Sequence, residues 1–332
     1  MDDYKYMVCT RCMTFNHAPY IEDTLNGFSM QETTSPVVFA IVDDASTDGE
    51  PEVIKKWCEK NLALNEDDVA YSKSLEYGSL LFARHKEHKN LFFVVLLLSF
   101  NHYSKRLFDL KVKYIQEWMD KAKYWAICEG DDYWIDSHKL EKQYNFLNEH
   151  KEYSMCFHNT KMLFENTEGC VPDGVTNDGQ VCADTLFLRW TVPTASIMYR
   201  NGADLYETKG NHRILYGDIM LILKCAESGK IWGMKEEMSV YRVHSDSAIH
   251  NKKKVDRDRF KEPQNTKFIL DNFNCVSRRL VRKRLGDDYF VCFCRSPRFS
   301  FESMKYLLLS VYYNPRFLLF FLKKSKRIIC KS

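Results

Sequence analysis

The sequence has no apolar run that approaches the roughly 20 residues needed to cross a membrane as a helix. Residues 1–5 are polar and acidic, unlike the basic and then apolar start of a secretion signal. We therefore expect a cytoplasmic protein, free or peripheral at the inner face of the cell membrane.

Two phosphate-binding loops are also missing. The chain has 13 glycines, and none stands in a G-x-x-x-x-G-K-[ST] or G-x-G-x-x-G pattern. This absence argues against ATPases and dinucleotide enzymes of those types. It also argues against a sugar-nucleotide nucleotidyltransferase, which needs a glycine-rich loop with Arg or Lys for a triphosphate. A bound phosphate would have to be held by other means, such as a metal ion. No nucleic-acid-binding motif is present, so we expect no nucleic-acid partner.

The 12 cysteines do not predict a disulfide framework. Cys9, Cys128, Cys156 and Cys225 lie within apolar stretches, where a reduced thiol packs like a small hydrophobic group. Cys9 and Cys12 fall within one expected strand and point apart, so zinc is not expected. These positions indicate a reducing compartment.

Apolar strand patterns and amphipathic helix patterns alternate in the first 150 residues, which predicts a parallel sheet flanked by helices. Strands are expected at 7–13, 37–42, 91–99 and 124–128, and the polar stretch 61–90 is expected to be an insertion. We predict an α/β fold with a mostly parallel, Rossmann-like central sheet. Further elements are expected as strands at 153–158, 195–199 and 240–244, and as helices from Pro19, from Pro51, at 138–150 and at 218–228.

Charge divides the chain unevenly. Residues 251–332 carry 21 Lys and Arg against 7 Asp and Glu, a net +14, whereas residues 1–250 carry −11. The segment 314–332 interleaves apolar and basic residues, which suits an anionic membrane surface. An ordinary basic helix packed on the domain, or a nucleic-acid patch, is the alternative.

The most informative segment is Glu129–Trp134, Glu-Gly-Asp-Asp-Tyr-Trp, which follows a short buried strand pattern. Three carboxylates emerge together there and repel one another unless a cation lies between them. Oxygen ligands favour Mg²⁺ or Mn²⁺, particularly when phosphates complete the coordination shell. The alternative is an acidic turn that caps the helix starting near Ser137.

Three polar loops follow three expected parallel strands, so we expect them to meet at one edge of the sheet, where open α/β sheets bind ligands. The segments are Thr14–Asn16, Asp43–Asp44 and Glu129–Asp132. Thr14 and Asp44 can hydrogen-bond a nucleoside, and a metal at Asp131 and Asp132 can hold a diphosphate. Together these loops predict a pocket for a nucleotide diphosphate.

The order of these motifs resembles the family 2 inverting glycosyltransferases, which have the GT-A fold. Met13–His17 resembles that family's opening Pro-Thr-Tyr-Asn, and Val42–Gly49 matches its Val-Asp-Asp-x-Ser-x-Asp-Gly. Glu129–Asp132 corresponds to its Asp-x-Asp region. The resemblance covers residues 5–60 and 110–250, and it includes Gly217-Asp218 and Met238–His244.

The resemblance implies a metal-dependent transferase, of hexosyl or N-acetylhexosaminyl type, that moves a sugar from a nucleotide-sugar donor. We expect a UDP-sugar, with a glycan or lipid-linked acceptor in cell-surface polysaccharide synthesis. Asp218 would be the general base, and Asp131, with Glu129 and Asp132, would hold Mn²⁺ or Mg²⁺. Thr14 and Asp44 would hold the nucleoside. A non-catalytic glycan-binding or membrane-binding relative is the alternative.

Other residues complete the expected site with less specific support. We expect Asn16 and Asp43 to line the donor pocket with the adjacent Thr14 and Asp44. His244 is expected to bind the metal and Arg242 the donor, since the two alternate onto one face of a strand; a solvated histidine is the alternative. Two further candidates for the donor site are Trp134, which fits a sugar-facing wall or the core equally, and Lys105, which fits a diphosphate contact or a solvated turn.

The chain also departs from the family pattern. Met13 replaces proline, Glu129 replaces the first aspartate, and Gly217 replaces a glutamate before Asp218. Asn101-His102-Tyr103 replaces a commoner Asn-x-Gly turn. We expect a glycosyltransferase domain over residues 1–250, with a donor half at 1–135 and an acceptor half at 136–250. Residues 251–332 are expected to form a basic helical appendage.

Overall fold

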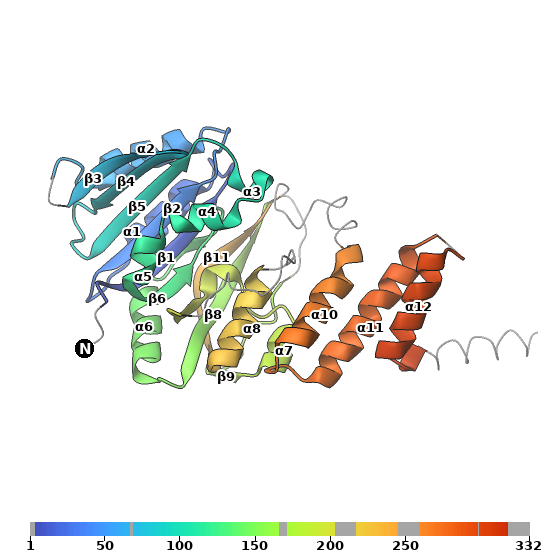
Figure 1. Cartoon of the computed structure of the whole chain (residues 1–332). Helices are drawn as coiled ribbons and strands as arrows, with labels where there is room; N and C mark the ends of the chain where they lie inside the picture. Colours follow the sequence, from blue (N-terminus) through green and yellow to red (C-terminus); the bar gives the residue numbers. More distant parts are fainter. Residues whose placement is uncertain are drawn as a thin grey trace, which may run out of the picture. The chain divides into compact units, whose positions relative to one another are not determined.

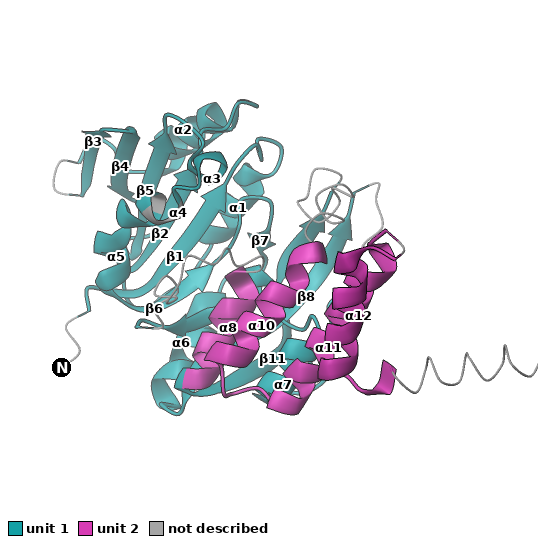
Figure 2. Cartoon of the chain, turned by 45° about the vertical axis from the view of Figure 1, so that its right-hand side comes forward, with its two compact units in different colours: residues 1–208, 228–244 teal, residues 209–227, 245–332 magenta. Residues whose placement is uncertain are grey.

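A computed structural model describes residues 4–66, 69–165, 171–202, 217–244, 259–297 and 299–317. The chain divides into two compact units (Figure 2). The first comprises residues 1–208 and 228–244, and the second comprises residues 209–227 and 245–332.

The first unit is built on a large mixed sheet (Figure 1). Its strand order is β3-β4-β5-β2-β1-β6-β10-β8-β11-β7, and β9 pairs with β11. The strands are β1 (Tyr6–Thr14), β2 (Val37–Asp43), β3 (Ala70–Leu75), β4 (Gly78–Arg84), β5 (Leu91–Leu98), β6 (Ala122–Ile127), β7 (Tyr133–Trp134), β8 (Tyr153–Phe164), β9 (Gly179–Val181), β10 (Met198–Arg200) and β11 (Lys230–Val243).

Four adjacent strands, β5, β2, β1 and β6, run parallel at the centre of this sheet. Every residue of β2 is buried, as expected for a strand covered on both faces. Antiparallel β10 joins β6 to β8, and β8 pairs in parallel with β11. The carboxyl ends of β1, β2, β5, β6, β8 and β11 therefore lie along one edge of the sheet.

The expected insertion at 61–90 contains an antiparallel hairpin, β3 and β4, that extends the sheet beyond β5. Four of the six β3 residues are exposed, so the strand lacks the apolar alternation by which half-buried strands are found in a sequence. For this reason the sequence does not predict the hairpin.

Helices of the first unit pack against the sheet through aromatic side chains. Phe28 of α1 stacks on Phe39 of β2 with ring centroids 4.8 Å apart, and Trp134 meets Phe28 edge-on at 4.9 Å. The helices are α1 (Ile21–Ser29), α2 (Glu50–Asn61), α3 (His102–Lys105), α4 (Phe108–Lys113), α5 (Gln116–Asp120), α6 (Lys139–Glu149) and α7 (Ala183–Leu188), with a 3-10 turn η1 (Thr194–Ser196).

The second unit is helical where it is described. Its elements are α8 (Gly217–Ser228, the last residue belonging to the first unit), η2 (Arg259–Lys261), α10 (Glu262–Asn272), α11 (Arg278–Arg295) and α12 (Phe301–Tyr313). No helix within the described ranges has the length and apolar character to span a bilayer. Most of the segment 314–332, expected at a membrane surface, lies outside the described residues.

The cysteines within the described ranges are free thiols, and those expected in apolar stretches are buried: Cys9, Cys128, Cys156 and Cys225. Cys12 is buried as well. Burial raises the pKa of Cys9 to about 12, so this thiol stays protonated at neutral pH. The buried cysteines therefore serve as packing groups.

Candidate active site

The loops after β1 and β2 are joined by their own side chains. The Asn16 N–H donates to Ser46 Oγ at 2.8 Å, and the Thr47 N–H donates to Asn16 Oδ1 at 2.8 Å. Asn16 and Ala45 adopt left-handed backbone conformations, with φ of 58° and 61°. Such conformations cost a non-glycine residue free energy and persist only when surrounding contacts enforce them. The two loops therefore form one rigid rim.

Glu50, at the start of α2, is hydrogen-bonded to both loops of this rim. Its carboxylate is fully buried and accepts hydrogen bonds from the Thr14 hydroxyl, the His17 N–H at 2.8 Å and Ser46 Oγ at 2.8 Å. A glutamate in the first turn of a helix is ordinarily explained by the helix dipole, so the sequence gives no separate sign of this role. Thr14, predicted to contact a nucleoside, is itself 3% exposed.

Asp44 connects the rim to the region after β5. Its two carboxylate oxygens accept the N–H groups of His102 at 2.7 Å and Tyr103 at 3.0 Å. These donors are the first N–H groups of α3, which have no partner within the helix. Asp44 thus fixes α3, and the exposed Lys105 lies at the end of this short helix.

Asp43 lies beside Asp44 at the end of β2 and is fully buried. Its Oδ2 accepts the Ser46 N–H at 3.2 Å, while Oδ1 has no hydrogen-bond partner among the described residues. Burial raises the pKa of Asp43 to about 6. This carboxyl is therefore poised to change its charge near neutral pH.

The loop after β6 contains carboxylates that face one another and two imidazoles. Asp131 Oδ2 lies 3.3 Å from His244 Nε2 and 3.7 Å from His17 Nε2. Burial would raise the pKa of Asp131, but the hydrogen bond from His244 and the neighbouring His17 outweigh it and lower the pKa. Asp131 is therefore ionised, with two imidazole nitrogens beside it.

Asp132 lies deeper in the same loop and is 1% exposed. Its Oδ1 accepts the Arg242 N–H at 2.9 Å, and Oδ2 has no hydrogen-bond partner in the described part of the chain. Burial and then the charge of Asp131 raise the pKa of Asp132 well above its usual value. A cation between the two carboxylates would reverse that shift.

These residues form two overlapping groups that share Asp131. Ligand atoms of His17, Asp131 and His244 lie within 4.8 Å of one another, and so do those of Glu129, Asp131 and Asp132. The unpartnered oxygen of Asp132 and the mixture of carboxylates with imidazoles fit a divalent cation. Imidazole favours Mn²⁺ over Mg²⁺. His17 was not expected as a ligand, although it stands in the motif after β1.

Gly130 brings the loop after β6 against the loop after β1. A Cβ atom at position 130 would lie 2.0 Å from Thr14 Oγ1 and 2.5 Å from Thr14 Cβ. Only glycine permits so close an approach. The Gly130 N–H also donates to the Met13 carbonyl at 3.3 Å, so the two loops share a fixed contact.

Arg242 lies on β11 beside this site, and its guanidinium already has protein partners. Its guanidinium pairs with Asp23 at 2.8 Å and Glu165 at 3.1 Å, and it donates to the Asp131 carbonyl at 3.3 Å. The side chain is 5% exposed and lies over the Tyr20 ring at 4.5 Å. Arg242 therefore holds the Asp131 loop in place, and its predicted donor contact stays a prediction.

Trp134 and Asp218 do not belong to either of these two groups of ligand atoms. Trp134 is 1% exposed, and its indole N–H donates to the Ala195 carbonyl at 3.0 Å, which favours the core alternative. Asp218 stands in the first turn of α8, in the second unit, and its Oδ1 accepts the Ile219 N–H at 2.9 Å. Burial raises the pKa of Asp218.

Comparisons with known proteins place the fold. No family model matches the chain. The uncharacterized proteins Rv1520 of Mycobacterium tuberculosis and Mb1547 of Mycobacterium bovis are 27% identical over 247 residues, which cover 72% of this chain and 59% of each relative. The chain thus spans less than two thirds of the length of the curated relatives it matches.

Among solved structures, Staphylococcus aureus TarS 1-349 in complex with UDP superposes with a TM-score of 0.55 at 15% identity, covering 93% of this chain and 81% of that one. The same fragment in a second structure gives 0.55, with coverages of 92% and 79%. At such identity the likeness shows the fold alone. The chain has the mixed α/β fold of GT-A glycosyltransferases, as the sequence predicted, with additional C-terminal helices.

Proposed function

We propose that this protein is a metal-dependent, inverting glycosyltransferase of family 2 that transfers one sugar from a nucleotide diphosphate, a UDP-sugar, to a glycan or lipid-linked acceptor. The observation that carries the proposal is the meeting of His17, Asp131 and His244 with Glu129 and Asp132 at the carboxyl edge of the sheet. A GT-A fold and a structural relative in complex with UDP support the same reading.

The roles of the donor-site residues follow from their contacts. Asp131 and Asp132, with Glu129 and the two histidines, would hold Mn²⁺ or Mg²⁺, which supplies positive charge for the departing diphosphate. The rigid rim of Asn16 and Ser46, anchored by Glu50, would hold the nucleoside in one orientation. Asp44 has two oxygens that already accept N–H groups, and each can accept a second hydrogen bond from the nucleoside.

Asp218 is the proposed general base. A base must be ionised and within hydrogen-bond reach of the acceptor hydroxyl, from which it removes a proton as that oxygen attacks the anomeric carbon. The raised pKa of Asp218 makes its carboxylate a stronger base than an exposed aspartate. One displacement inverts the anomeric carbon, so the reaction needs no nucleophilic residue of the enzyme.

The experiment that tests this assignment compares two variants. Asp218→Asn should lower acceptor-dependent turnover by about a hundredfold or more and leave donor affinity within a factor of about three. Asp184→Asn is the matched control, because Asp184 stands at the same position of α7 and carries no proposed role. Equal turnover in wild type and Asp218→Asn would contradict the base assignment.

Attachment to an anionic membrane surface at the cytoplasmic face is a separate part of the proposal. One face of α12 exposes Phe301 (87%), Met304 (45%), Leu308 (69%) and Tyr312 (64%), at positions that form an apolar stripe. The region 251–332 supplies a net charge of +14. Apolar and basic groups together suit a headgroup region rich in anionic lipids.

The membrane proposal is tested by flotation with vesicles of phosphatidylglycerol and phosphatidylcholine. Phe301→Ser combined with Leu308→Ser should reduce the bound fraction severalfold, as should deletion of residues 314–332, without change in hydrolysis of a soluble donor. Undiminished vesicle binding by both variants would remove the membrane proposal and leave the transferase proposal intact.

A further inference from the structure

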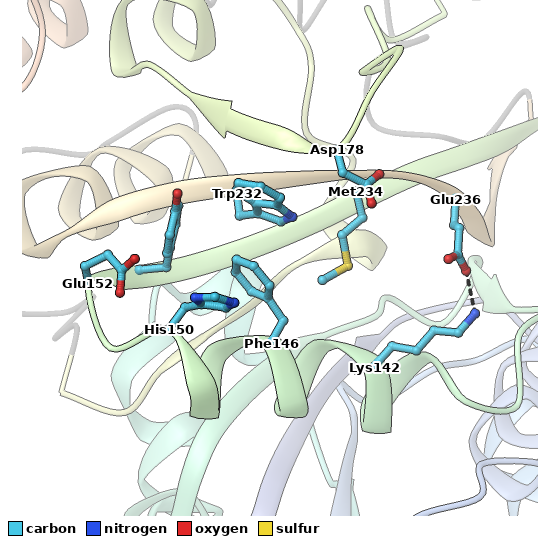
Figure 3. A pocket seen from close by; sticks show the side chains of 9 residues that line it. Lys142, Phe146, His150, Glu152, Asp178, Trp232, Met234 and Glu236 are labelled. Atoms are coloured by element: carbon cyan, nitrogen blue, oxygen red, sulfur yellow. Dashed lines mark hydrogen bonds and ion pairs between the residues drawn. The ribbon is translucent and has the colours of Figure 1, made fainter.

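A cavity lies in the first unit, lined by residues of α6, β8, β11 and the loops before β8 and β9 (Figure 3). Its volume is about 500 Å³, within the range of about 300–1,000 Å³ that is usual for small-ligand sites. None of its lining residues belongs to the groups of ligand atoms around Asp131, so the two sites use different side chains. The lining residues are Lys142, Phe146, His150, Glu152, Tyr153, Asp178, Trp232, Met234 and Glu236.

Aromatic rings form one part of the lining. Trp232 of β11 stacks with Phe146 of α6 at a centroid distance of 5.0 Å, and the Tyr153 ring meets Trp232 nearly at a right angle at 5.4 Å. Figure 3 shows Trp232 and Met234 on the strand opposite Phe146 and His150. Phe146, Trp232 and Met234 are only partly buried, although each is large and apolar. These side chains offer a preformed apolar surface that solvent reaches.

Charged groups stand around this surface and are mostly acidic. Glu152, Asp178 and Glu236 are exposed carboxylates. Lys142 is the one lysine of the lining, and its ammonium is already paired with Asp136 at 2.7 Å and with Glu236. The cavity therefore carries a net negative charge and disfavours phosphates and other anions.

Where β9 covers β11, the strand behind the cavity has no unpaired edge among the described residues. Ile231, Trp232 and Gly233 of β11 pair with β8 on one side and with β9 on the other. A peptide that binds by strand addition needs an unpaired edge. Recognition in this cavity must therefore come from side chains.

We propose that this cavity is a carbohydrate-binding site for a neutral or amino-sugar hexopyranose unit of a glycan. A pyranose ring presents C–H groups on its faces and hydroxyl groups around its rim. The C–H faces fit the apolar side chains of Phe146, Trp232 and Met234. The hydroxyl groups donate to the carboxylates of Glu152, Asp178 and Glu236, which are strong acceptors.

Some of these acceptors are held in place before a ligand arrives. The Lys235 N–H donates to Asp178 Oδ1 at 2.8 Å, and Lys142 fixes the Glu236 carboxylate. Prior positioning reduces the entropy that a ligand must overcome on binding. The site requires no metal and no nucleotide, so it does not depend on the proposed transferase activity.

The experiment measures binding of neutral hexasaccharides to the full chain without any donor. Maltohexaose, cellohexaose and chitohexaose are titrated by calorimetry and by saturation-transfer NMR. At least one should bind, and Trp232→Ala should weaken its binding about tenfold or more, as expected for removal of a central aromatic contact. Trp190→Ala is the matched control, because Trp190 is also partly buried and packs on Tyr241 outside the cavity. Because Trp190 does not line the cavity, this variant should change the hexasaccharide affinity by less than about twofold.

A second variant, Glu152→Gln, separates loss of binding from loss of folding. Glu152 is exposed, so Glu152→Gln should leave the melting temperature unchanged while weakening hexasaccharide binding about threefold through one weaker hydrogen bond. The proposal is overturned if none of the three hexasaccharides binds at millimolar concentration, or if both tryptophan variants weaken binding equally. Tighter binding of hexalysine or of a heparin hexasaccharide than of any neutral sugar would also overturn it.

Discussion

The two acidic loops of the first unit use their carboxylates in different ways. After β2, Asp44 and Glu50 accept hydrogen bonds from N–H and hydroxyl groups of neighbouring segments. After β6, Asp131 and Asp132 face one another and two histidines, and one oxygen of Asp132 has no partner among the described residues. Carboxylates with protein donors hold structure, whereas carboxylates gathered without enough donors take up a proton, as the raised pKa of Asp132 indicates, or a cation, as we propose for this loop.

The largest expected effect is on metal affinity, which should depend on the loop after β6 and not on the loop after β2. Asp131 belongs to both groups of potential ligands, so Asp131→Asn should weaken Mn²⁺ binding about a thousandfold, equivalent to about 4 kcal/mol. Calorimetry with Mn²⁺ alone measures this without any activity. Asp48→Asn is the control from the other loop and should leave Mn²⁺ affinity nearly unchanged. Similar losses in both variants would end the distinction between the loops.

The next largest expected effect is the pH dependence of the free energy of unfolding, and it comes from Asp43 in the loop after β2. Burial raises the pKa of Asp43 to about 6, above its ordinary value of 3.8, so between these pH values the folded protein binds more protons than the unfolded chain. The free energy of unfolding should therefore fall by up to about 3 kcal/mol as pH rises from 4 to 7. Asp43→Asn should remove this part of the pH dependence, as urea unfolding at several pH values would show.

A smaller effect is expected at Glu50, where a substitution should lower the stability of the protein without changing its metal affinity. Glu50→Gln keeps the size of the side chain but removes the charge and one acceptor oxygen, so the free energy of unfolding should fall by about 2 kcal/mol. Mn²⁺ affinity should change little. A large loss of Mn²⁺ affinity with unchanged stability would place Glu50 among the metal ligands instead.

The smallest effect tests the backbone of the rim. Ala45 has a φ of 61°, so Ala45→Gly should relieve strain and stabilise the protein by about 0.5 kcal/mol. Gly49 has a φ of 94° and open space around its Cα, so Gly49→Ala should destabilise by about 1 kcal/mol through backbone strain alone. Thermal unfolding of both variants measures the pair, and equal signs would contradict the argument.

Much of the fold could be predicted because its central strands are continuous apolar runs that end in polar loops. The expected strands at 7–13, 37–42 and 91–99 correspond to β1, β2 and β5 within a residue at each end. The carboxyl ends of parallel strands must share an edge, so the meeting of the three polar loops also followed from the sequence. The hairpin of β3 and β4 did not, because its outer strand is largely solvated.

The site could be predicted less fully, because side-chain partners depend on tertiary geometry. Glu50 reaches Thr14 and His17 only because two left-handed residues fold their loops together. His17 and His244 meet at Asp131 from opposite ends of the domain sequence. The strand position of His244 predicts that it lies near the carboxylates after β6, but the spacing of the residues gives no sign that His17 also reaches Asp131. The spacing also could not decide whether Trp134 faced a ligand or the core.

The contact between Gly130 and Thr14 has a consequence for how the first unit responds to its ligands. Because a side chain at position 130 would overlap Thr14, the loop after β6 and the loop after β1 are packed too closely to shift independently. In the proposed function these loops hold the cation and the nucleoside, so a change in the affinity for one ligand should be matched by an equal change in the affinity for the other.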